Sequence, residues 1–175
     1  TQPIEDTGHG DHAFRHVLTR DVAYASLPIG DRANRHARVA DWLERRAPEA
    51  DDGAALALLA YHYERAVVLA RAVDHTDPGL AGRAFAALVR AGRSEHRRDG
   101  LRRADHWYRR ARDLGSFDAA AMLDAVEEHG TVLLELRQLD AARDAFERSS
   151  GGPRRPIRDA PTSPSPTSAP SPASR

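Results

Sequence analysis

Residues 91–111, AGRSEHRRDGLRRADHWYRRA, decide the fold class of this chain of 175 residues. Ala104 follows Gly92 after 12 positions, Tyr108 follows after 4 more, and Ala111 after another 3. A glycine break lies between the first position and the others, so one small residue falls on a first helix and a small–aromatic–small stripe on a second. Small residues let two antiparallel helices approach, and the aromatic ring fills the space beside them.

The same intervals return 38 positions later, where Gly130, Ala142 and Phe146 repeat the first two of them. The next position is Ser149 instead of alanine, which predicts a frayed or terminal unit. These offsets match the tetratricopeptide pattern, whose usual period is about 34 residues. The interval of 38 positions is about four longer than this period, and the loop at 114–118 accommodates the additional residues. A generic helical bundle with alanine-rich interfaces stays open as the alternative, because alanine is common throughout the chain.

Hydrophobic periodicity predicts an all-α fold, with helices at about 17–27, 32–47, 54–72, 79–98, 101–114, 117–137 and 139–149. The expected N-caps are Asp31, Asp77 and Ser116. The expected breaks are at Pro28, Gly30, Gly100 and Gly115. Residues 12–15 could form a short strand. The Pro- and Ser-rich stretch 151–175 is too polar to bury a core, so we expect a disordered tail there.

The composition excludes several classes of function. The chain has 26 basic and 26 acidic residues, which argues against a dedicated binder of nucleic acid or of an anionic membrane. It contains no cysteine, and therefore no disulfide, thiolate zinc site or cysteine nucleophile. No apolar run approaches the roughly 20 residues that span a bilayer. A cytoplasmic location is the expectation, and the start at Thr1 suggests a fragment or a processed product.

The motifs of common enzymes do not occur in the sequence. It has no phosphate-binding P-loop and no G-x-S-x-G nucleophile motif, so we expect no catalysis and no cofactor. His9, His12 and His16 have a spacing at which a metal site is conceivable, but no carboxylate is clearly placed to complete it. A local hydrogen-bonding role is favoured for His16. His36 and His62 lie on apolar helical faces, where core or interface histidines are the simpler interpretation.

The stretch 14–27, FRHVLTRDVAYASL, carries a second pattern. It fits Phe-x-His-x-Leu-x-x-Asp-x-x-Tyr-x-x-Leu at every position. It resembles the end of the winged-helix domain that follows the nucleotide-binding core of bacterial AAA-like or STAND-type signalling ATPases. Later segments match the same family in order: Arg32, His36, Ala40, Leu43 and Glu44, then Ala60, His62, Tyr63 and Ala66, then Ala91 and Gly92. Arg35 stands where the family usually has leucine.

The resemblance implies three parts: a partial winged-helix remnant and linker helix at 1–48, tetratricopeptide-like repeats of an α-solenoid at 49–150, and the tail. Members of the family are often joined to class III adenylate or guanylate cyclases, and others to a LuxR-type DNA-binding domain. The chain would then be a non-catalytic regulatory module. Its partners would be the upstream ATPase or cyclase domains and a protein or small effector in the repeat groove. The alternative is the sensor arm of a LuxR-type transcriptional regulator.

Two sets of residues follow as candidates. The interface candidates are Phe14, His16, Arg20, Asp21, Tyr24, Arg32, His36, His62 and Tyr63. The repeat-packing candidates are Gly92, Ala104, Tyr108, Ala111, Gly130, Ala142 and Phe146. A winged helix without its first helices would leave an exposed apolar patch at Val17, Leu18, Tyr24 and Leu27, of the kind that marks an interface.

Overall fold

The computed structural model describes residues 17–46, 52–75, 77–115 and 118–149, and within these ranges it contains seven α-helices and no strand. The expected all-α class is confirmed. The helices are α1 (Val17–Ala25), α2 (Ile29–Arg46), α3 (Gly53–Arg71), α4 (Pro78–Arg97), α5 (Leu101–Leu114), α6 (Ala119–Glu135) and α7 (Leu139–Ser149). Phe14, His16, the expected strand at 12–15 and the tail lie outside the described residues.

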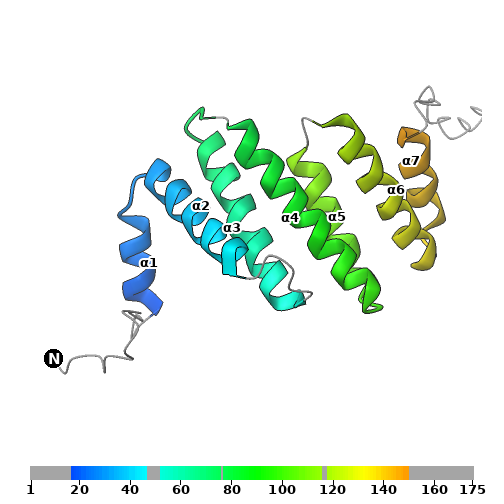
Figure 1. The fold of residues 1–175 in the computed structure, drawn as a ribbon, viewed down its shortest axis with the longest axis horizontal. Helices are drawn as coiled ribbons and strands as arrows, with labels where there is room; N and C mark the ends of the chain where they lie inside the picture. The colour runs from blue at the N-terminus through cyan, green and yellow to red at the C-terminus, as the bar shows by residue number, and fades with distance from the viewer. Residues whose placement is uncertain (1–16, 47–51, 76, 116–117, 150–175) are drawn as a thin grey trace, which may run out of the picture.

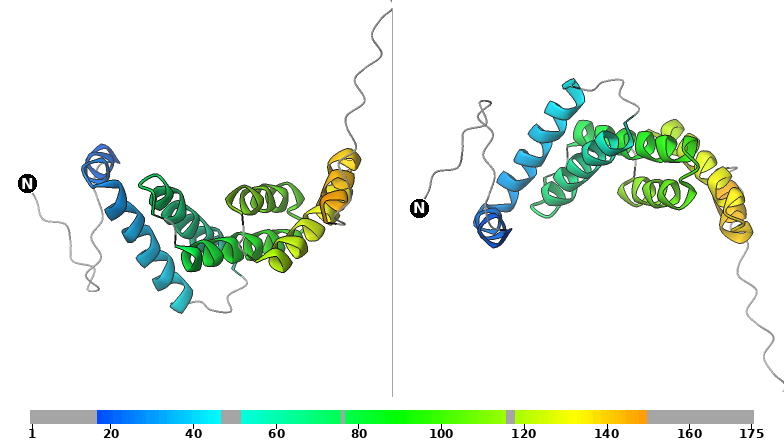
Figure 2. Two further views of the ribbon diagram at one scale, coloured as in Figure 1. Left: turned by 90° about the horizontal axis from the view of Figure 1, so that it is seen from above. Right: turned by 90° about the horizontal axis from the view of Figure 1, so that it is seen from below.

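The helices α2 to α7 run up and down in a row, and each packs extensively on the next one in sequence (Figure 1). The row bends into an arch, with α3 and α5 on its inner side and α4 and α6 on its outer side (Figure 2). Packing between sequence neighbours is typical of helical repeats. Within the described ranges, no helix combines the length and apolar character that crossing a bilayer requires.

The core consists of alanines and a few large side chains. One apolar cluster extends from α2 to α6 and includes the buried Tyr63, Phe85 and Leu88. A second cluster joins α6 to α7 through Val126, Leu133, Ala142 and Ala145. The last hairpin therefore has a small apolar core of its own.

Three helices begin at an aspartate whose carboxylate accepts backbone N–H groups of the first turn. Asp77 does so for α4 with proline directly after it, as the sequence predicted. Asp52 has the same role for α3. The expectation that Ser116 caps α6 was wrong, because Asp118 accepts from the N–H groups of Ala120 and Ala121. The carboxylate lies two residues closer to the helix and adds negative charge at its positive end.

The boundary between α1 and α2 also differs from the expectation. α1 ends at Ala25, and α2 begins at Ile29 instead of near residue 32. The Pro28 carbonyl accepts the N–H of Arg32 at 3.0 Å, so Asp31 lies in the first turn and is not the cap. Proline is tolerated at this point because a helix start needs no N–H from it. Gly30 therefore continues the helix instead of breaking it.

The turns inside the two last hairpins are alike. Asp99, between α4 and α5, and Arg137, between α6 and α7, both have positive φ angles, of 56° and 61°. In each turn the following N–H reaches back five residues, from Gly100 to Glu95 at 2.8 Å and from Gln138 to Leu133 at 2.9 Å. This is the Schellman arrangement of a helix end. It recurs at the same interval of 38 positions as the small residues.

The small residues lie where two helices meet. A Cβ atom added at Gly92 would lie 3.0 Å from the Tyr108 ring, and one added at Gly130 would lie 2.7 Å from the Phe146 ring. The candidates Ala104, Ala111 and Ala142 are fully buried. The backbones of α4 and α5, and of α6 and α7, thus approach each other where side chains are smallest.

We predict that Gly92→Ala lowers the free energy of unfolding. Tyr108 is 1% exposed and its hydroxyl donates to Glu128 at 2.9 Å, so the ring cannot easily move away from the new methyl group. Overpacking of this kind costs about 1–3 kcal/mol, which exceeds the gain of roughly 1 kcal/mol from replacing a helical glycine. Urea unfolding followed by circular dichroism measures the difference.

Gly82→Ala is the matched control, because Gly82 lies in the same helix with no atom within 4 Å of an added Cβ. It should raise stability by up to about 1 kcal/mol. Equal shifts of both variants would show that Gly92 is not a close contact.

Candidate functional site

A groove of about 690 Å³ opens between α1, α2, α3 and α5, on the side of the arch where α3 and α5 lie. We call it the inner groove. Its walls carry aromatic rings, imidazoles and both signs of charge. The lining residues are Arg20, Asp21, Tyr24, His36, Tyr61, His62, Glu64, Arg65, Val68 and Arg110.

Helix α3 supplies half of the wall because of its spacing. Tyr61, Arg65 and Val68 are separated by four and three residues, which places them on one face of a helix. The opposite stripe of α3, with Leu59, Tyr63 and Ala66, is buried in the core. Tyr61 and Val68 consequently remain 45% and 44% exposed in the groove, although both are large and apolar in part.

A chain of hydrogen bonds connects α1, α2 and α3 within the groove. The Tyr24 hydroxyl lies 3.1 Å from His36 Nε2, and His36 Nδ1 lies 2.9 Å from His62 Nδ1. Only one of the two facing imidazole nitrogens carries a proton in this contact. When Tyr24 donates to His36, His36 donates to His62, and the Nε2 of His62 then carries its own N–H.

Both histidines are neutral near pH 7. Burial is the main cause that lowers the pKa of His36, to about 4, and the neighbouring His62 and Arg65 lower it further. Burial also lowers the pKa of His62. A desolvated imidazole loses more by becoming charged than one in water does.

The charges of the groove are unevenly paired. Arg20 bonds to Asp21 at 2.9 Å, and Arg110 pairs with Glu64 while its guanidinium lies 4.9 Å from the centre of the Trp107 ring. Arg65 forms no ion pair with any carboxylate in the described part of the chain. With neutral histidines, three arginines face two carboxylates, and Arg65 supplies the excess positive charge.

Five of the interface candidates line this groove together: Arg20, Asp21, Tyr24, His36 and His62. Arg32 lies beside them, with its guanidinium 5.3 Å from the Tyr24 ring centre and its Nε donating to the Leu27 carbonyl at 2.9 Å. The candidates Phe14 and His16 lie outside the described residues.

Tyr61, Arg65 and Arg110 also line the groove, although they were not among the candidates from the sequence. Tyr61 and Arg65 were detectable, because they are spaced four apart on α3 and flank the candidate His62. Arg110 was not detectable, since it reaches the groove only through its pairing with Glu64 across 46 positions of sequence.

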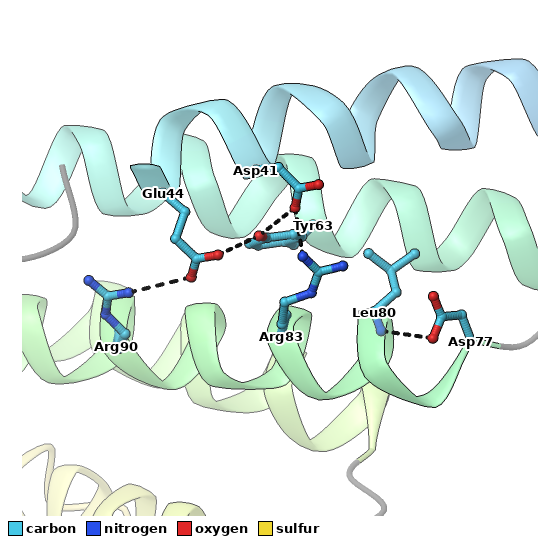
Figure 3. Close-up of polar contacts among 7 residues, drawn as sticks. All are labelled: Asp41, Glu44, Tyr63, Asp77, Leu80, Arg83 and Arg90. Atoms are coloured by element: carbon cyan, nitrogen blue, oxygen red, sulfur yellow. Dashed lines mark hydrogen bonds and ion pairs between the residues drawn. The ribbon is translucent and has the colours of Figure 1, made fainter. Parts of the chain in front are cut away.

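The last candidate, Tyr63, lies in a separate polar contact between helices (Figure 3). Its ring is buried, and its hydroxyl lies 2.9 Å from Asp41 and 2.6 Å from Glu44 on α2. Arg83 and Arg90 of α4 approach the same two carboxylates, at 2.7 and 4.0 Å. Burial and both carboxylates raise the pKa of Tyr63. This contact holds three helices together and does not face the groove.

A buried histidine links α5 to α6 in a similar way. His129 is 1% exposed, its Nε2 lies 2.7 Å from Asp105, and its ring stacks on Tyr108 with centroids 5.7 Å apart. Burial lowers the pKa of His129, against the opposing effect of Asp105. A second cavity, of about 430 Å³, lies beside it.

Part of the expected apolar patch is exposed on α1. Leu18 is 77% exposed and Val22, four residues later on the same face, is 70% exposed. Tyr24 and Leu27 are half-buried, since Tyr24 packs on His36. Nothing is described for the Val17 side chain.

Within the described ranges, no group of three or more histidine and acidic side chains is arranged to hold a metal ion. The His9, His12 and His16 spacing lies outside those ranges. No family model matches the chain, and no curated protein matches it. The resemblance to signalling ATPases therefore rests on the motifs of this sequence.

We predict that stability falls as the pH falls from about 6.5 to about 4, in part because of His36. In that window the unfolded chain binds a proton on His36 while the folded chain, with a pKa of about 4, does not. His36→Gln should reduce the slope of the urea midpoint against pH. His75→Gln, which changes an exposed histidine outside the groove, should leave the slope as it is. An unchanged slope in His36→Gln would contradict the assignment.

We also predict that Tyr63→Phe lowers the free energy of unfolding by about 1–3 kcal/mol, because Asp41 and Glu44 lose the single hydroxyl proton that they share. Tyr61→Phe removes a hydroxyl from an exposed tyrosine two positions earlier in α3 and should change stability by less than about 0.5 kcal/mol. Thermal or urea unfolding of both variants tests this. A smaller loss of unfolding free energy in Tyr63→Phe than in Tyr61→Phe would contradict a structural role for the Tyr63 hydroxyl.

Proposed function

We propose that this chain is a non-catalytic interaction module that binds a partner in the inner groove. The observation that carries the proposal is that Tyr24, Tyr61 and Arg65 line one open cavity of about 690 Å³. Together with Arg110, these side chains come from three helices, α1, α3 and α5. Tyrosine and arginine contribute most to binding energy at protein interfaces. A groove with these side chains is suited to a peptide or a loop of another protein.

The position of α1 suggests how binding is transmitted. α1 is not among the helices that pack extensively on a neighbour, and Tyr24 joins it to His36 on the wall of the groove. A partner in the groove that displaces Tyr24 would therefore shift α1. Leu18 and Val22 are exposed on α1 and offer an apolar contact to an adjoining domain.

The resemblance of residues 14–27 supports a more specific version. In it the chain is the regulatory region of a signalling ATPase linked to a nucleotide cyclase, and α1 is the junction with the upstream domains. A sensor arm of a LuxR-type regulator would use the same groove and would differ in the domain attached to it.

The proposal predicts that peptides selected from a random library on the purified chain bind in the inner groove. Tyr61→Ala should weaken the best peptide by about tenfold or more, as expected for an anchoring aromatic residue. Trp42→Ala, which removes an exposed aromatic side chain from α2 outside the groove, should change the affinity less than about twofold. Fluorescence anisotropy measures both.

Three outcomes would contradict the proposal. The first is that no peptide binds, and the second is that the selected peptides bind Tyr61→Ala as well as the unaltered chain. The third is hydrolysis of ATP by the purified chain, since a non-catalytic module should release no phosphate above the buffer rate.

A further inference from the structure

Arg65 is the arginine of the inner groove for which the described ranges contain no paired carboxylate. Arg20 is paired with Asp21 and Arg110 with Glu64, whereas Arg65 has no carboxylate partner in the described ranges. It lies on α3, half-buried, one turn after His62. A guanidinium in such a place offers two parallel N–H groups to a carboxylate.

His62 adds a second donor beside Arg65. In the arrangement where Tyr24 donates to His36 and His36 to His62, the remaining N–H of His62 lies on its Nε2. Residues three apart on a helix are neighbours, so this N–H and the Arg65 guanidinium belong to the same stretch of the groove wall.

We propose that the inner groove binds an acidic peptide segment, that one of its carboxylates is held by Arg65 and His62, and that binding places a proton from solvent on the His36–His62 pair. This rests on the proposed function and names the chemistry of the partner. A peptide suits the groove better than a small free anion because Tyr24, Tyr61 and Val68 offer contact to a chain beyond its carboxylate.

The coupling to a proton follows from the charges around the two rings. Arg20, Asp21 and Tyr24 face the groove from α1, with Arg32 beside them on α2. Glu64 and Arg65 face it from α3, and Arg110 faces it from α5. The two carboxylates are already paired with arginines. A carboxylate of the ligand would neutralise Arg65, whose charge helps to keep His36 neutral, and would favour the imidazolium form.

The test compares fluorescein-labelled hexaglutamate with hexaglutamine on the full chain, by anisotropy at about pH 7.5 and about pH 5.5. Glutamate side chains have a pKa near 4.3, so the probe stays largely ionised over this range. Hexaglutamate should bind more tightly than hexaglutamine, and its affinity should rise with falling pH, by at most about tenfold per pH unit for one proton taken up. Calorimetry in two buffers of different ionisation enthalpy should show net proton uptake on binding.

Three single substitutions to glutamine show which residues cause the affinity for hexaglutamate and its pH dependence. Arg65→Gln should weaken hexaglutamate by about tenfold at both pH values, whereas Arg102→Gln, which removes an exposed charge of α5 outside the groove, should not. His62→Gln should leave binding at the higher pH within about threefold and remove most of the pH dependence. Sodium acetate and inorganic phosphate serve as free anions, and either one competing as well as hexaglutamate would overturn the peptide assignment.

Equal binding of hexaglutamate and hexaglutamine, equal losses in Arg65→Gln and Arg102→Gln, or no proton uptake would each overturn the inference. These outcomes are separate from failure of the proposed function. If the library peptides lack acidic residues but still require Tyr61 for binding, the proposed function as an interaction module holds. Only the inference of an acidic partner is then wrong.

Discussion

The close approach of α4 and α5 at Gly92 is the contact on which the rest of the arch depends. The Tyr108 ring occupies the space that a side chain at position 92 would need, and its hydroxyl continues to Glu128 on α6. Tyr108 thus sets the distance between α4 and α5 and also connects α5 to α6. Because α5 also carries Arg110, the same packing positions the far wall of the inner groove.

Polar contacts between neighbouring helices follow a common plan. A buried tyrosine hydroxyl reaches a carboxylate of an adjacent helix, and an arginine of α4 neutralises that carboxylate. Tyr63, Asp41 and Arg83 form one such group, and Tyr108, Glu128 and Arg93 form another. Each hydroxyl donates to a charged acceptor, which makes these hydrogen bonds stronger than those between neutral groups. They define the pairing of helices whose apolar faces are largely alanine and could otherwise slide.

The sequence predicted helices better than it predicted contacts. The Asp77–Pro78 start and the turn at Gly100 have local causes, so the pattern identifies them within a residue or two. Ser116 was predicted to cap α6, but Asp118 can also cap a helix, and which side chain caps depends on which one reaches the free N–H groups of the first turn. The meeting of His36 with His62 depends on how α2 and α3 pack, 26 positions apart, which no local pattern contains. Periodicity alone would have placed Arg65 beside His62, but it could not show that no carboxylate in the described ranges pairs with Arg65.

The separate apolar cluster of α6 and α7 affects the order in which the helices unfold. Its four buried residues lie on α6 and α7, whereas the larger cluster extends from α2 to α6. In an array where each hairpin touches only its neighbours, stability is close to a sum of local terms. Of these two helices only α7 lies outside the larger cluster, so α7 can unfold while α2 to α6 keep their shared core. Unfolding of α7 would therefore leave in place the inner groove, which is lined by α1, α2, α3 and α5.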